Sequence, residues 1–327
     1  MPSLNPLILQ EVLIQCLKKD NDSRSLGKFM LSGQEPFAVA LNYFRKATFV
    51  EISENCLHIT IKIGKETYTH SISYQFSLIN IVMKTVVSSI KEYCINMIPK
   101  HFNAIEYFLE QKIENVKVPQ SLPEKYRKIL ATCDFIKKIT VNNVFSENAL
   151  DMIPHTCREL KFQFWYFDNH CTKNVMKISK KYLKNIEKLE IETTCSWQKR
   201  HTSSFILNNF PNLQTINALF YYQDEIQYVI DLVKDKKLIY FQKLAKSNIT
   251  GKITFKNWIT RYAHAFSRRL NKPVYEKVLQ DVIEIPGVTF DSEEKTITRT
   301  VELKKNLIVE FVICFTPQNN DFSPFKN

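Results

Sequence analysis

An apolar triplet recurs along this chain at intervals of 23 to 27 residues. Its members occupy relative positions 0, 3 and 5, and the clearest copies are Ile136-Ile139-Val141, Ile186-Leu189-Ile191 and Leu213-Ile216-Ala218. Weaker copies stand at Ile113-Val116-Val118, at Leu160 and at Leu238-Phe241. A fixed period in this range predicts stacked units, each made of one short strand and one helix. Such arrays bind partners and seldom catalyse reactions, so the period favours a binding protein.

The spacing inside each triplet is similar to the core of leucine-rich repeats. The last two members are two residues apart, so they lie on one face of a strand. The asparagine or cysteine that usually follows the strand is missing, and Val144, Thr194 and Tyr221 stand at these positions. The copy at Leu160 is also out of phase, because Phe162 and Phe164 form its alternating pair. We therefore expect a short, irregular leucine-rich-repeat-like array over residues 113–258. The alternative is an ordinary α/β domain whose spacing is coincidental.

Glycine is rare, with five in the 327 residues. Phosphate-binding loops, nucleophile elbows and dinucleotide-binding fingerprints each need glycine at fixed offsets, and the sequence contains none of these motifs. The apolar content of 44% is enough for substantial cores. We therefore predict a folded protein that is not an enzyme and needs no cofactor. A hydrolase with an unrecognised site is the enzymatic alternative.

The formal net charge of +12 raises the question of a nucleic-acid partner. The basic residues are dispersed, as in Lys236 with Lys237 and Arg268 with Arg269, and no run of five occurs. Dispersed lysine is typical of a solvated surface, so we favour a protein partner over nucleic acid. A basic repeat protein that binds nucleic acid, or a general scaffold for protein–protein interactions, is the alternative function.

Eight cysteines occur without a closely spaced pair. The residues considered as metal ligands are Cys157, His170, Cys171, Cys195 and His201. Their spacing lacks the close ligand pairs of a structural zinc site, so we predict no metal. No local signature selects a cysteine and a histidine for nucleophilic catalysis.

The first residues do not resemble a secretory signal, because no basic cluster is present and Glu11 interrupts the first apolar stretch. No apolar run reaches the roughly 20 residues that span a bilayer. We therefore expect a cytoplasmic or nuclear protein with reduced thiols and no membrane association.

Three short helices are predicted at the N-terminus. Residues 4–17 carry an apolar stripe at helical spacing, with Asn5 and Pro6 as the entry signal. Further helices are predicted around 26–31 and 37–44. Three helices in about 45 residues predict a small module with its own core.

Later segments alternate between strand and helix patterns. Residues 57–63 and 67–74 alternate around Gly64 and predict a β-hairpin. Residues 76–112 read as largely helical, divided by Pro99, and helices are also predicted over 258–270 and 274–282. From Val288 the pattern is β, with a turn at residues 304–306, which predicts a cap on the array.

The N-terminal helices resemble an F-box, a motif of about 45 residues that often precedes a partner-binding domain such as leucine-rich repeats. Glu11-Val12-Leu13 and Cys16-Leu17 match its first helix, and Leu31-Ser32 matches its central valine-serine. Leu9 replaces the family's proline, and the closing tryptophan is absent. Together with the array, the module is most similar to the divergent, expanded F-box proteins of nematodes.

This resemblance implies a substrate-recognition adaptor of a cullin-RING (SCF-type) ubiquitin ligase, with an unknown target protein bound by the array. The implied contacts to the ligase's small adaptor subunit, and through it to the cullin complex, are Leu9, Val12, Leu13, Leu17, Leu26, Phe29 and Leu31. The alternative is that these residues only close the core of the module.

The resulting fold prediction is a mixed α+β or α/β chain. Its expected parts are an F-box-like helical module (1–50), a β-hairpin and helical connector (51–112), the array (113–258), C-terminal helices with a β-hairpin cap (259–316) and a mobile tail (317–327).

Overall fold

The computed structural model describes residues 5–19, 24–99, 103–119, 122–142, 151–167, 183–195, 202–222, 241–258, 280, 282–293 and 296–314. The chain combines helices with a mostly parallel arrangement of strands, so the expected mixture of α and β structure is confirmed. It divides into two compact units. The first contains the described residues up to 142 together with 151–157, and the second contains those from 158 onward. This division falls inside the range predicted for the array.

The first unit begins with the three predicted helices. They are α1 (Pro6–Lys19), α2 (Arg24–Leu31) and α3 (Gln34–Phe44). Asn5 caps α1, because its side-chain Oδ1 accepts a hydrogen bond of 2.9 Å from the Leu7 backbone N–H. The helices bury a shared apolar core that includes Leu13, Leu26 and Met30. The prediction of three short N-terminal helices with buried apolar side chains is therefore confirmed.

Six strands of the first unit lie side by side in the order β6-β5-β4-β1-β2-β3. Their bounds are β1 Ala47–Ile52, β2 Cys56–Ile63, β3 Glu66–Ser73, β4 Glu92–Ile95, β5 Asn115–Pro119 and β6 Lys138–Asn142. β1, β2 and β3 pair antiparallel, whereas β1, β4, β5 and β6 pair parallel. The predicted hairpin is confirmed as β2 and β3, with Gly64 at the turn.

Along the sequence, a helix precedes each of the last three parallel strands of this unit. They are α4 (Ile79–Val87) before β4, α5 (Ala104–Glu110) before β5, and α6 (Glu124–Thr132) before β6. The prediction that 76–112 is helical apart from a break at Pro99 is wrong at β4. Tyr93, Cys94 and Ile95 are all buried there, and β4 pairs with β1. A short apolar run has no periodicity that separates a buried strand from a buried helix, and the partner strand decides the outcome.

A buried hydrogen bond ties α3 to β3. The Tyr43 hydroxyl lies 2.7 Å from Nε2 of His70, and both side chains are buried. The Tyr68 ring stacks on His70 from the same strand. Burial, and secondarily the positive charge of Lys18, lowers the pKa of His70 to about 4. The histidine is therefore neutral in the folded protein near pH 7.

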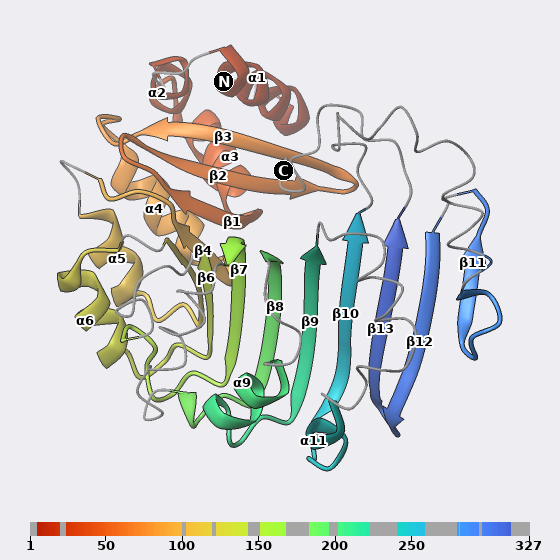
Figure 1. The fold of residues 1–327 in the computed structure, drawn as a ribbon. Coiled ribbons are helices and arrows are strands. Elements are labelled where there is room, and N and C mark those ends of the chain that lie inside the picture. The colour runs from red at the N-terminus through yellow and green to blue at the C-terminus, as the bar shows by residue number, and fades with distance from the viewer. Residues whose placement is uncertain are drawn as a thin grey trace, which may run out of the picture. The chain divides into compact units, whose positions relative to one another are not determined.

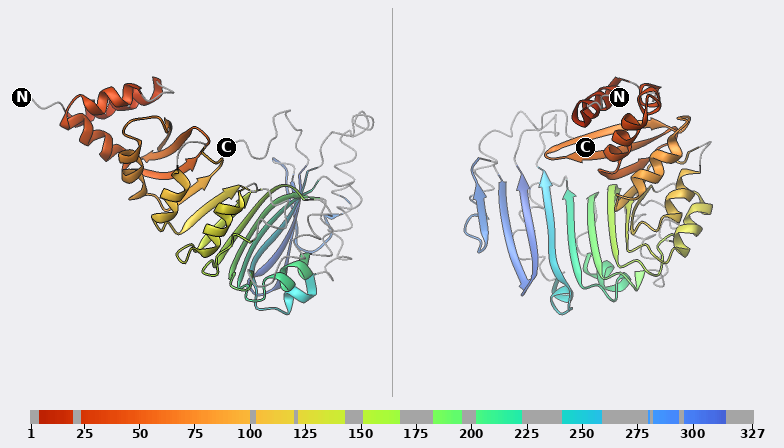
Figure 2. Two further views of the ribbon diagram at one scale, coloured as in Figure 1. Left: turned by 90° about the vertical axis from the view of Figure 1, so that its left-hand side faces the viewer. Right: turned by 180° about the vertical axis from the view of Figure 1, so that it is seen from behind.

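The strands of the second unit follow the order β11-β12-β13-β10-β9-β8-β7. They are β7 Glu159–Phe167, β8 Lys188–Cys195, β9 Thr215–Tyr222, β10 Thr250–Trp258, β11 Val288–Asp291, β12 Thr296–Lys304 and β13 Leu307–Cys314. The strands from β7 to β10 are parallel neighbours in chain order, and β13 continues them (Figure 1). Helices α9 (Thr202–Asn209) and α11 (Gln242–Ala245) lie at the end where β9 and β10 begin (Figure 2).

The predicted triplets occupy matching positions on these parallel strands. In the second unit the paired apolar residues form buried rows, of which one is Leu160-Leu189-Ile216 and the next is Phe162-Ile191-Ala218-Ile253-Val309. A third row stacks Phe220, Phe255 and Phe311, with ring centroids 5.2 and 5.5 Å apart. In the first unit Val116 pairs with Ile139 in the same way. We call these rows the apolar ladder.

One predicted copy of the triplet is wrong. Leu238 lies outside the described residues, and Phe241 immediately precedes α11 and not a strand. The strand at this step of the ladder is β10, which presents Ile253 and Phe255. Phe241 is buried, and its ring centroid lies 5.5 Å from that of Phe255. It therefore packs into the core although it does not belong to a strand.

The C-terminal strands agree with the prediction: β12 and β13 form an antiparallel hairpin around Asn306, and β11 pairs with β12. The helix predicted from Trp258 does not begin there, because Trp258 ends β10. The remainder of that helix, most of the next one and the tail lie outside the described residues.

Gly251 is required where β10 enters the sheet. Its φ is +123°, and a Cβ at this position would lie 1.9 Å from the Ile216 carbonyl oxygen of β9. We expect Gly251→Ala to lower the free energy of unfolding by more than about 3 kcal/mol, measured by urea denaturation. Gly64→Ala is the control: its φ is +62° but nothing lies within 4 Å, so the expected loss is about 1 kcal/mol. Equal losses would contradict the close approach of β9 and β10.

His70 makes stability depend on pH. The unfolded chain binds a proton near pH 6.5, whereas folded His70 binds one only near pH 4, so stability falls as pH drops through this window. The expected loss between pH 7 and pH 4 is about 1 to 3 kcal/mol. His70→Gln removes the titrating group and flattens this part of the urea-denaturation profile. Identical slopes in the wild type and in His70→Gln would exclude His70 as the cause.

Candidate functional site

The strands of the second unit present a polar face on the side opposite the apolar ladder. Side chains alternate between the two faces of a strand, and residues paired in register share a face. The register therefore places Lys161, Glu190 and Asn217 on one side, with Lys252 on the next strand. We define the polar face as the alternate residues of β7 to β13 that pair in this register. Its side chains are half-buried or exposed for most of its length.

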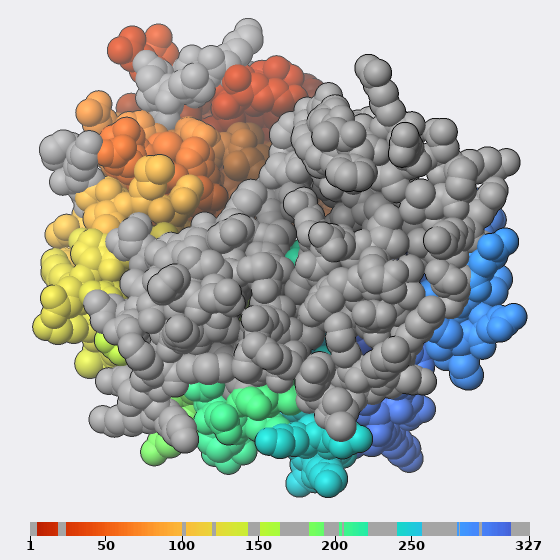
Figure 3. Space-filling model, viewed as in Figure 1, coloured from red at the N-terminus to blue at the C-terminus, as the bar shows by residue number. Residues whose placement is uncertain are grey.

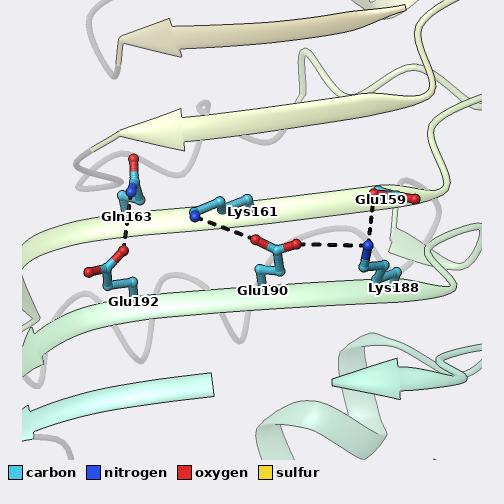
Figure 4. A network of polar contacts seen from close by, with 6 residues as sticks. All are labelled: Glu159, Lys161, Gln163, Lys188, Glu190 and Glu192. Carbon is cyan, nitrogen blue, oxygen red and sulfur yellow. Dashed lines mark hydrogen bonds and ion pairs between the residues drawn. The ribbon is translucent and has the colours of Figure 1, made fainter. Parts of the chain in front are cut away.

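Ion pairs link β7 to β8 across this face (Figure 4). Nζ of Lys188 lies 3.3 Å from Oε2 of Glu159 and 3.9 Å from Oε1 of Glu190. Nζ of Lys161 lies 3.4 Å from Oε2 of Glu190. These side chains point toward one another from the two neighbouring strands (Figure 4). Glu190 therefore sits between two lysines.

Further along the same strands, Glu192 has a different kind of partner. The Gln163 side-chain amide donates a hydrogen bond of 3.2 Å to its Oε2 (Figure 4). A neutral amide does not compensate the charge of a carboxylate as an ammonium group does. The Glu192 charge also acts on Tyr221 of β9: burial, and after it Glu192, raises the pKa of that phenol.

A second set of contacts joins β10 to β13. Nζ of Lys252 lies 2.9 Å from Oε2 of Glu310, and the Thr254 hydroxyl donates to the same oxygen over 3.3 Å. Both partners of this ion pair belong to the polar face, because Thr254 pairs in register with Glu310. Lys252 is thus held toward β13.

Between these two groups the face is hollowed over β9. The hollow has a volume of about 250 Å³ and is lined by Lys161, Glu190, Ile191, Glu192, Asn217, Leu219, Lys252 and Thr254. Asn217 and Leu219 are shorter than the lysine and glutamate side chains on the flanking strands. Their small size leaves the depression, so the hollow follows directly from the sequence of β9.

Acidic residues outnumber basic ones on the polar face. The register places four lysines on it, Lys161, Lys188, Lys252 and Lys256, against six acids, Glu159, Glu190, Glu192, Asp291, Glu302 and Glu310. The whole chain, in contrast, has a formal charge of +12. A phosphate backbone needs uncompensated cations, so the polar face is a poor surface for nucleic acid.

The N-terminal helices carry the other surface feature. Seven large hydrophobic side chains are exposed in the part of the chain that the structure describes, and four of them are in these helices: Leu7, Ile8, Val12 and Leu31. Their exposed fractions are 71%, 53%, 45% and 70%. Atoms of the helices, red in Figure 3, lie on the surface in that view. Exposed apolar side chains gathered on a small module are typical of an interaction site.

The structure divides the residues predicted to contact the adaptor subunit. Leu9, Leu13, Leu26 and Phe29 are buried in the module's own core, Leu17 is half-buried, and Val12 and Leu31 are exposed. Ile8 and Val12 are four residues apart and therefore share a helix face. Leu7 and Ile8 were not among the predicted residues, although they belong to the same apolar run.

A cysteine and a histidine lie close together in β2, but their contact does not activate the cysteine as a nucleophile. Cys56 Sγ lies 3.4 Å from Nε2 of His58, whose Nδ1 lies 2.7 Å from the Ser71 hydroxyl. Burial, and then the negative charge of Glu51, raises the pKa of the Cys56 thiol. A nucleophilic cysteine needs the opposite shift, so this contact does not form an activated pair.

Of the residues considered for zinc, the structure describes the side chain of Cys157, which is buried. The side chain of Cys195, and the whole of His170, Cys171 and His201, lie outside the described part of the chain. Among the described residues, no three histidine, cysteine or acidic side chains group in a way that would hold a metal ion.

Comparison with known protein families and with curated proteins finds no match for this chain. Among the helices that the structure describes, none has the length and apolar character needed to cross a membrane.

The residues of the polar face were not singled out from the sequence. They alternate with the ladder residues, so a signal for them existed in the strand period of two. Which of them meet, however, depends on pairing between strands that are distant in the sequence, as with Lys161 and Glu190.

Neighbouring residues of β8 test the assignment of the two faces. Glu190→Gln removes the ion pairs to Lys161 and Lys188 on the polar face, and its expected cost in unfolding free energy is below about 1 kcal/mol. Ile191→Ala empties a position that is 3% exposed, and its expected cost is about 2 to 5 kcal/mol. Urea denaturation measures both free energies of unfolding. A larger loss for Glu190→Gln than for Ile191→Ala would show that the two faces are wrongly assigned.

Proposed function

We propose that this protein is a substrate-recognition adaptor of a cullin-RING ubiquitin ligase. Its N-terminal helices bind the small adaptor subunit of the ligase, and the polar face of the array binds a target protein. The observation that carries the proposal is the presence of two features in one chain: exposed apolar side chains on α1 and α2, and a charge-paired sheet face in the second unit.

The helical module supports the first half of the proposal. It closes its own core with Leu9, Leu13 and Leu26, yet leaves Ile8 and Val12 exposed on α1. Contact with a partner helix would remove these side chains from water, which stabilises a complex by about 1.5 to 3 kcal/mol for each fully buried side chain. The buried residues then support the contact surface from behind, while the exposed ones make the contact.

The sheet supports the second half. Parallel strands that follow one another in the chain present successive side chains side by side, and the mixed charges of the polar face are arranged for selection among protein partners. The excess of acids on this face disfavours the alternative of nucleic-acid binding there.

Co-purification with the adaptor subunit tests the proposal. We expect the wild-type chain to retain the purified subunit, and Ile8→Asp or Val12→Asp to weaken retention about 10-fold or more, because each places a charge in an apolar contact. Leu13→Asp is a poor test, since Leu13 is 0% exposed and a charge there would unfold the module.

Ala38→Asp is the matched control, because Ala38 is exposed on α3 and the substitution adds the same charge. It should retain the subunit as the wild type does. Failure of the wild type to retain the subunit would refute the ligase function. Equal retention by all variants would show that the contact lies elsewhere on the chain.

A further inference from the structure

We propose that the hollow over β9 receives a basic side chain, best an arginine, from a segment of the target protein, with the Glu192 carboxylate as its ionic partner. This inference rests on the proposed function, because it assigns a recognition chemistry to the polar face. It identifies the target by one feature, a basic residue presented on its surface.

The contacts of the four glutamates around the hollow single out Glu192. Glu159 and Glu190 have lysine partners on the neighbouring strand, and Glu310 has Lys252. The contact that the described residues make to Glu192 comes from the neutral Gln163 amide. A cationic partner at Glu192 would therefore complement the negative charge of this carboxylate, which the Gln163 amide does not neutralise.

The lining of the hollow also fits a basic side chain. Leu219 offers apolar surface to the methylene stem, as lysine and arginine stems prefer. Asn217 and Thr254 supply oxygens that can accept additional guanidinium N–H bonds. Arginine is favoured over lysine because its planar fork can bind a carboxylate through two parallel hydrogen bonds.

An anionic ligand fits less well. The two lysines that line the hollow, Lys161 and Lys252, are already held by Glu190 and Glu310. A phosphate or a carboxylate would have to displace one of these partners and would also face Glu192. The net acidic balance of the polar face points in the same direction.

Fluorescence anisotropy with the full chain and short labelled peptides tests the inference. The probes are oligo-arginine, oligo-lysine and oligo-glutamate, titrated at near-physiological salt so that distant charges are screened. We expect oligo-arginine to bind more tightly than oligo-lysine, and oligo-glutamate not to bind. Glu192→Gln should weaken oligo-arginine binding about 10-fold, since it removes a charge-assisted contact without changing shape.

Two further variants distinguish binding in the hollow from nonspecific electrostatic attraction to the polar face. Leu219→Trp fills the hollow without altering charge and should also weaken binding about 10-fold. Glu302→Gln makes the same charge change as Glu192→Gln on the polar face, but at a residue that does not line the hollow. Its expected effect is below about 2-fold. Each variant is first compared with the wild type in thermal unfolding.

Three results would overturn the inference: absence of oligo-arginine binding, equal weakening by Glu192→Gln and Glu302→Gln, or preferential binding of oligo-glutamate. A single-stranded oligonucleotide that binds and is released by Lys252→Gln would assign the face to nucleic acid instead. None of these results affects retention of the adaptor subunit by the helices, so failure of this inference and failure of the ligase function are distinguishable.

Discussion

The register between parallel strands is the constraint on which the second unit depends. Because side chains alternate with a period of two, a shift of one residue would move every ladder residue to the opposite face. The rows through Leu189 and Ile191 fix this register by burial. The same register aligns Lys161 with Glu190 and leaves the hollow over the short side chains of β9. The candidate binding surface is thus a consequence of how the core packs.

Much of this fold could be predicted from the sequence, where patterns were long or repeated. The helical stripe of α1, the hairpin around Gly64 and the ladder residues were all recognisable from local periodicity. β4 was not, because its buried residues have no periodicity and its strand character comes from pairing with β1. The ladder copy at Phe241 failed for a related reason: an aromatic residue can reach the core from a turn as well as from a strand.

The candidate sites were less accessible to sequence reasoning. A helical stripe identifies apolar residues but does not tell which of them the module covers itself, so Leu13 and Val12 looked equivalent although one is buried and the other exposed. The F-box resemblance predicts a partner at these helices, and the structure shows which of their apolar side chains are exposed. On the sheet, the contrast between Glu190 and Glu192 depends on which residues of β7 lie opposite, which no local pattern contains.

We propose that one chain holds two separate binding surfaces, helices for the ligase and a sheet face for the target. Hydrogen–deuterium exchange of the full chain, alone and with the adaptor subunit, tests it most directly. If the helices bind the subunit, amide exchange within α1 and α2 becomes slower when the subunit is added. Exchange in β8, β9 and β10 is expected to stay unchanged. Protection of those strands by the subunit, with none in α1 and α2, would contradict it.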